Sequence, residues 1–161
     1  MKKNKIIKII LLILFIIYFI VLTKLILFKY GYNFLKAAMM EWNISLVRQH
    51  TQSANIIPFS TIVWSIRMGG WKITLLFYNI IAFVPFGIFC KLYSYKSTLL
   101  KSLIIGVLVS LLFEVIQLVT LLGEFDIDDI ILNTLGVFIG YLVSVATGNI
   151  YKRLRKDEVE K

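Results

Sequence analysis

The sequence contains four apolar runs that are each long enough to cross a membrane as a helix. They cover residues 6–28, 71–92, 99–122 and 130–147. A helix rises about 1.5 Å per residue, so roughly 20 apolar residues span the hydrocarbon core of a bilayer. Of the 161 residues, 59% are hydrophobic and 17% are charged, which is typical of membrane proteins. We therefore predict an all-α integral membrane protein built as a bundle of four transmembrane helices.

The sequence leaves no room for a separate soluble domain between these runs. We predict one membrane domain over residues 1–161, with a tail at residues 148–161. The run that follows "MKKNKIIK" is too long for a signal peptide, so we expect an uncleaved first span. A loop of roughly 40 residues, 29–70, joins the first two spans. Within it, "YNFLKAAMMEWNISLVRQ" predicts an interfacial helix with Trp42 at the headgroup level, and "NIIPF" and "MGG" indicate turns.

The basic residues predict the orientation of the bundle. Four spans place both termini on one side, where twelve lysine and arginine residues lie, whereas six lie on the other side. The positive-inside rule therefore predicts cytoplasmic termini and a cytoplasmic tail. The long loop and the "GEFDIDD" segment would then be extracytoplasmic. These basic residues lie between apolar runs, so we expect contacts with lipid headgroups and no nucleic-acid partner.

Polar residues recur in the outer half of the predicted spans. Glu114 is a carboxylate well inside the third span, where an ionisable group usually faces the bundle or a wet cavity and marks a functional site. Gln117 shares its helix face, and Asn79 lies at a similar depth in the second span. A polar pocket that opens outward would follow from these depths. Asn79, Gln117 and Asn133 can alternatively serve only as hydrogen bonds between helices.

The segment "DIDD" precedes the fourth span and contains three aspartates. Asp126 and Asp128 can simply solvate the loop, and Asp129 can cap the fourth helix, because a carboxylate pairs with the free amides at a helix start. From Asp129 a single helix face continues through Asn133 to Gly136 and Gly140. The two glycines favour close packing of helices.

Five short motifs lie in a fixed order between residues 25 and 141. They are "LILFKYGYN", "NIIPF", "NIIAFVPFG", "SLLFEVIQ" and "DIDDIILNTLGVFIG". In their order and spacing they resemble the VanZ family of bacterial membrane proteins, which is named for a teicoplanin-resistance protein. The resemblance implies a location in the bacterial plasma membrane. Many relatives have an arginine shortly before the first aspartate, where this chain has Glu124, so the loop is poorly suited to bind an anion.

The resemblance also implies two sets of important positions. The ligand-binding candidates are Asn55, Asn79, Glu114, Gln117, Asp126, Asp129 and Asn133, and the structural candidates are Pro58, Pro85, Gly87, Gly136 and Gly140. We also expect Pro85 to kink the second span.

The function implied by the resemblance is low-level resistance to teicoplanin, a lipid-tailed glycopeptide, without alteration of the peptidoglycan precursor. Our first hypothesis is a non-enzymatic envelope protein whose outer pocket binds a lipid-linked cell-wall precursor or a lipoglycopeptide. Membrane lipids are its expected partners, and a homo-oligomer is compatible with the sequence.

Two other hypotheses remain open. In an intramembrane enzyme acting on a lipid or a lipid-linked cell-wall component, Glu114 would be a general base, and Asp126, Asp128 and Asp129 would hold a divalent cation. In a small transporter or flippase subunit, Glu114 would be a proton site. Cys90 and His50 are the single residues of their types, so we expect no intrachain disulfide, no histidine-based metal site and no cofactor.

Overall fold

The computed structural model describes residues 2–28, 31–93 and 97–159. That part of the chain folds into seven α-helices and has no extended strand. The helices are α1 (Lys2–Leu27), α2 (Gly31–Glu41), α3 (Ile44–Gln52), α4 (Ser60–Met68), α5 (Trp71–Tyr93), α6 (Leu99–Thr120) and α7 (Ile127–Val159).

Four of these helices are long and apolar enough to cross a membrane, which confirms the predicted all-helical architecture with four spans. The spanning segments are Ile6–Leu27, Trp71–Tyr93, Leu99–Thr120 and Ile127–Asn149. Large apolar side chains stay exposed along their outer surfaces, as expected for helices that contact lipid. The protein is therefore a multi-pass membrane protein.

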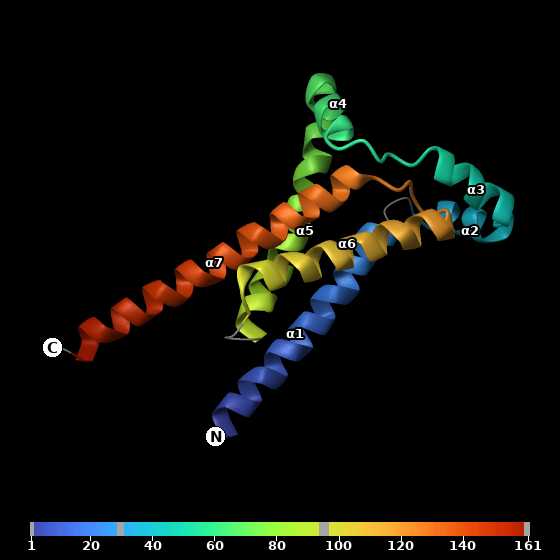
Figure 1. The fold of residues 1–161 in the computed structure, drawn as a ribbon. Coiled ribbons are helices and arrows are strands. Elements are labelled where there is room, and N and C mark those ends of the chain that lie inside the picture. Colours follow the sequence, from blue (N-terminus) through green and yellow to red (C-terminus); the bar gives the residue numbers. More distant parts are fainter. Residues whose placement is uncertain (1, 29–30, 94–96, 160–161) are drawn as a thin grey trace.

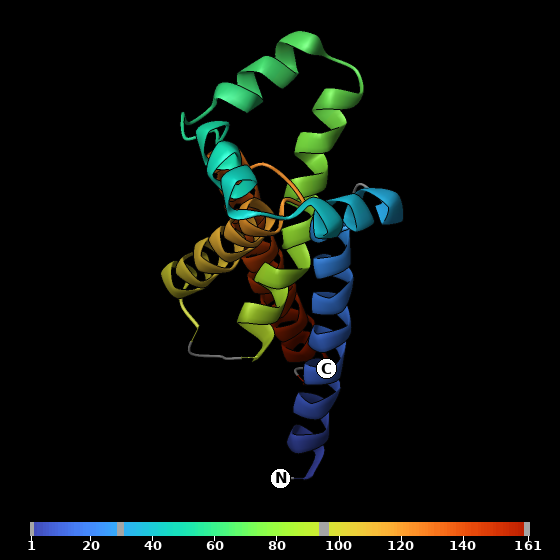
Figure 2. The same cartoon turned by 90° about the vertical axis from the view of Figure 1, so that its right-hand side faces the viewer.

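The short helices gather at one end of the bundle. Figure 1 shows α2, α3 and α4 at the end where α1 and α6 stop and where α5 and α7 begin. Figure 2 shows the two marked termini toward the opposite end. The segment between the first two spans is thus a structured cap over one end of the bundle.

The bundle is held together by close contact between α5 and α7. A Cβ atom added at Gly136 would lie 2.2 Å from the Ile80 carbonyl oxygen, and one at Gly140 would lie 1.9 Å from that of Val84. Gly87 on α5 meets the Val137 carbonyl in the same way, at 2.1 Å. Only glycine allows two helix backbones to approach this closely.

A small apolar core lies beside this contact. It consists of the buried residues Leu22, Phe83, Phe86, Phe113 and Val137, which come from all four spans. Pro85, the proline expected to kink the second span, lies within α5, and the helix continues beyond it to Tyr93.

The predicted single interfacial helix is two helices, α2 and α3, which meet at a break near Trp42. The side chain of Asn43 accepts a hydrogen bond from the Leu46 amide (2.9 Å) and so caps the N-terminus of α3. The Trp42 indole N–H donates to the Val119 carbonyl (2.8 Å) and ties this break to α6. The prediction of one continuous helix was wrong because asparagine is a strong helix N-cap.

Helix α4 has no capping side chain of its own. Its N-cap residue is Phe59, which has a left-handed backbone (φ 67°) and no side-chain acceptor. The carboxylate of Asp128, in the first turn of α7, instead accepts hydrogen bonds from the amides of Phe59 and Ile62, the latter at 3.0 Å. Asp128 is 0% exposed, so it does not solvate the loop but holds α4 against α7.

Gly140→Ala should lower the free energy of unfolding by about 1–3 kcal/mol, because the added methyl group forces α5 and α7 apart. Thermal unfolding of the purified protein in detergent, followed by circular dichroism, measures this effect. Gly148→Ala is the matched control on the same helix, because its Cβ would meet nothing within 4 Å. Equal melting temperatures for the two variants would contradict the close backbone packing.

Asp128→Ala should release α4 from the bundle, because it leaves two backbone amides without an acceptor. We expect hydrogen exchange at Phe59 and Ile62 to accelerate at least about tenfold, which is what the loss of one or more charge-assisted hydrogen bonds implies. Glu41→Ala, which removes an exposed carboxylate at the end of α2, is the control. Unchanged exchange in Asp128→Ala would show that α4 is held by other contacts.

Candidate functional site

Asp126 joins two segments that lie far apart in the sequence. The residues on either side of Asp126 form backbone hydrogen bonds with Asn55: the Asn55 amide donates to the Phe125 carbonyl (2.8 Å), and the Ile127 amide donates to the Asn55 carbonyl (2.9 Å). The carboxylate accepts from Asn55 Nδ2 (2.8 Å) and from Thr61 Oγ1 (2.7 Å). The connection between α3 and α4 is therefore fixed to the turn between α6 and α7.

Asp126 also begins α7. Its Oδ1 accepts a hydrogen bond from the Asp128 amide (2.9 Å), which is the geometry of a helix N-cap. The alternative that Asp129 caps this helix does not hold, because α7 starts at Ile127 and Asp126 is in the N-cap position. Asp129 lies in the first turn, where its carboxylate accepts a hydrogen bond from Asn79 of α5.

Glu114 stabilises the turn between α6 and α7 through a hydrogen bond to its backbone. It is 2% exposed, and its Oε2 accepts a hydrogen bond from the Asp126 amide (2.9 Å). This bond satisfies a buried backbone donor and sets the position of Asp126. Glu114 therefore positions the turn and is enclosed by the bundle.

Two further predicted residues are also buried between helices. The Gln117 amide group donates to the Ile26 carbonyl (3.2 Å) and links α6 to α1. Asn133 donates to Ser110 Oγ (2.8 Å) and links α7 to α6. Both contacts match the interhelical hydrogen bonds that were considered for amides inside the spans.

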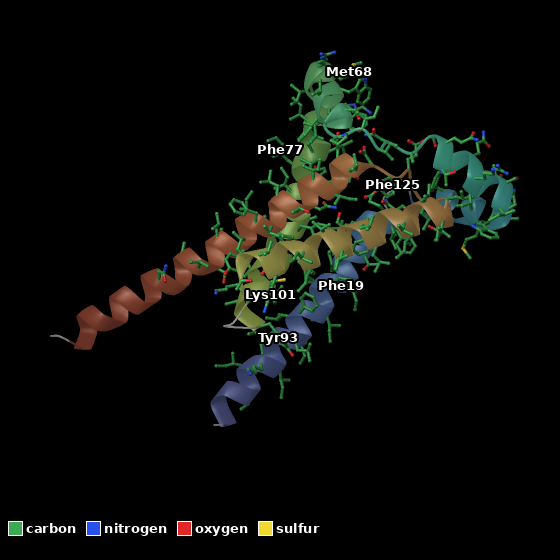
Figure 3. All side chains as sticks on the ribbon, viewed as in Figure 1. Phe19, Met68, Phe77, Tyr93, Lys101 and Phe125 are labelled. Atoms are coloured by element: carbon green, nitrogen blue, oxygen red, sulfur yellow. The ribbon has the colours of Figure 1, made fainter. Side chains whose placement is uncertain are left out.

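Two separate cavities have volumes that suit a small ligand: one of about 460 Å³, lined by residues that include Glu41 and His50, and one of about 590 Å³, which lies directly beside Asp126. It is bounded by α4, the first turns of α5, the α6–α7 turn and the end of α1. Figure 3 marks Phe125, one of its lining residues, at the α6–α7 turn. We call this space the outer cavity.

The outer cavity divides the predicted site residues into two groups. Asn55, Asn79, Asp126 and Asp129 line it. The remaining candidates, Glu114, Gln117 and Asn133, are buried behind it and are not among its lining residues. Of the structural candidates, Gly87, Gly136 and Gly140 form the α5–α7 contact, and Pro58 lies in the turn before α4.

The outer cavity contains an aromatic wall that the sequence did not predict. The Lys72 ammonium lies 4.1 Å from the ring centroid of Trp71 and 4.7 Å from that of Trp64, within the range of cation–π attraction. All three residues line the cavity, as do Glu124 and Tyr78. Tryptophan at a span end indicates only an interface position, so the sequence signal for this wall was weak.

The three aspartates do not converge on one point. Asp126 faces Asn55 and Thr61, Asp128 faces the start of α4, and Asp129 faces Asn79. Among the residues that the structure describes, no group of three or more His, Cys, Asp or Glu side chains is arranged to hold a metal ion. The geometry therefore gives no support to a shared divalent cation.

The chain is similar to one protein family and to a known member of it. The VanZ/LLP1 family model matches residues 15–148. Protein VanZ of Enterococcus faecium is 32% identical over 123 residues, which cover 76% of this chain and 66% of that protein, so the chain spans just under two thirds of the relative's length. No solved structure matches the chain. The matched region covers most of each of the four apolar spans and the whole outer cavity. The chain belongs to the VanZ/LLP1 family.

Proposed function

We propose that this protein lowers the susceptibility of the cell envelope to teicoplanin and similar lipid-tailed glycopeptides by binding a lipid-linked or glycopeptide ligand in the outer cavity. The cavity, about 590 Å³ in volume, is the observation that carries this proposal. Its volume falls within the range of roughly 300–1,000 Å³ that small-molecule sites occupy. The teicoplanin part of the proposal comes from the resemblance to the VanZ family.

The lining of the outer cavity suits a ligand that is part polar and part apolar. Asn79 and Asp129 supply polar groups on the side of the bundle, and Leu25, Leu75 and Leu76 supply apolar surface. Asn79 lies about 12 Å below the start of α5, since it is eight residues into the helix. The cavity therefore reaches from the end of the bundle into the level of the spans.

The charge distribution supports an outward-facing cavity. The cavity lies at the end of the bundle opposite the two termini. The order of the spans in the sequence assigns twelve of the eighteen basic residues to the side of the termini, for which the positive-inside rule predicts a cytoplasmic location. In this orientation the outer cavity faces the outer leaflet of the bacterial plasma membrane, where a glycopeptide or an exported lipid-linked precursor can reach it.

Binding is better supported than catalysis. The enzyme hypothesis used Glu114 as a general base, but Glu114 is 2% exposed and accepts a hydrogen bond from a backbone amide. A general base must lie within hydrogen-bond reach of the proton that it removes. The residues that do line the cavity supply carboxylates, amides and aromatic faces, which are groups suited to recognition.

Asn79→Ala and Asp129→Ala should each return the teicoplanin susceptibility of an expressing host to that of the host without the protein. Each change removes a polar group from the cavity and breaks the hydrogen bond between Asn79 of α5 and Asp129 of α7. The measurement is the minimal inhibitory concentration, together with the amount of protein in the membrane. Glu41→Ala, outside the outer cavity, should keep full resistance.

Full resistance in both cavity variants, at normal membrane levels, would show that the outer cavity does not act in resistance.

A further inference from the structure

The outer cavity carries a net negative charge although the chain as a whole is basic. Among the described residues, Glu124, Asp126 and Asp129 line it, together with the ammonium group of Lys72. Among the lining residues that the structure describes, the formal charges therefore sum to −2, whereas the chain has a net charge of +9. A concave site lined by one sign of charge attracts ligands of the opposite sign.

The aromatic wall is already occupied by a cation of the protein itself. The Lys72 ammonium lies over the rings of Trp64 and Trp71. A cationic group of a ligand would be repelled by Lys72 and attracted to the carboxylates of the lining. One of these carboxylates, Asp129, is hydrogen-bonded to Asn79, which lies seven residues and about 10 Å along α5 from Lys72.

The apolar part of the outer cavity opens toward the lipid. Leu25 of α1, Leu75 of α5 and Tyr78 of α5 line the cavity, and each remains exposed on the surface of a spanning helix. An acyl or similar chain can therefore lie partly in the cavity and partly in the membrane. Such a side opening is unsuited to a small hydrophilic ion alone.

We propose that the ligand of the outer cavity is a lipid-tailed molecule with a protonated amine, whose ammonium group pairs with Asp129 and Asp126 and whose tail lies along Leu25, Leu75 and Leu76. This inference rests on the proposed function, in which the cavity holds a ligand, and adds the chemical class of that ligand. Glu124 at the rim adds to the attraction, and Lys72 keeps the amine at the acidic side. An amine-bearing membrane lipid and an amine-bearing lipoglycopeptide share this chemistry.

The test compares ligands that differ only in the charge of the amine. The purified full-length protein in lipid nanodiscs is given phosphatidylethanolamine or its N-acetylated form with identical acyl chains, and bound lipid is counted by native mass spectrometry. A second arm uses teicoplanin before and after N-acetylation. Acetylation should weaken binding at least about tenfold in one arm, because it removes a charge-assisted hydrogen bond. The arm that responds identifies the source of the ligand.

Variants assign the effect to the proposed residues. Asp129→Asn can still accept the hydrogen bond from Asn79, yet it removes the charge, so the preference for the free amine should fall. Glu124→Gln should reduce the preference to a smaller extent. Glu41→Gln, a carboxylate outside the outer cavity, should preserve the full preference.

Equal binding of both members of both pairs, absence of binding by every probe, or a full preference that persists in Asp129→Asn would each overturn the proposal. Leu75→Trp separates this failure from failure of the proposed function, because it fills the apolar part of the outer cavity. If Leu75→Trp abolishes binding while acetylation has no effect, the cavity binds a ligand but does not select an amine. If Leu75→Trp leaves binding unchanged, the outer cavity is not the binding site.

Discussion

Carboxylates at the end of a membrane-spanning bundle require hydrogen-bond donors, and this requirement organises the end at which α2, α3 and α4 lie. A buried carboxylate without a hydrogen-bond partner is energetically costly, and four acids near the α6–α7 turn each accept hydrogen bonds. The donors come from the turn itself, from the α3–α4 connection and from α5. The pairs are Glu114 with the Asp126 amide, Asp126 with Asn55 and Thr61, Asp128 with the amides of Phe59 and Ile62, and Asp129 with Asn79.

These hydrogen bonds also create the outer cavity. They hold α4 near the start of α5, and two of the same aspartates, Asp126 and Asp129, line the outer cavity. The glycine contact makes this possible, because close approach of α5 and α7 brings Asn79 within reach of Asp129. Packing deep in the bundle and polar contacts at its end are thus parts of one arrangement. Asp126 and Asp129 therefore both help to fix the fold and contribute negative charge to the cavity.

The spans were predictable from the sequence, whereas the cap over the cavity was not. Apolar runs of helical length define the four spans to within a few residues, because lipid requires a continuous apolar surface. The role of Asp128 could not be predicted from the sequence, because its hydrogen-bond partners Phe59 and Ile62 lie 69 and 66 residues away along the chain. Helix periodicity reports the face of a helix and not its distant partners. One signal was available: α4 begins after Phe59, with no local capping side chain.

The most direct test of the account is a photo-crosslinker placed in the wall of the outer cavity in living cells. Benzoylphenylalanine at Tyr78 reports on the cavity, and at the neighbouring Phe77 it reports on general lipid, because both side chains are exposed but only Tyr78 lines the cavity. Figure 3 marks Phe77 on α5. The account predicts that irradiation at position 78, and not at 77, captures one lipid-tailed ligand in excess over bulk lipid. The same mixture of bulk lipids at both positions would contradict it.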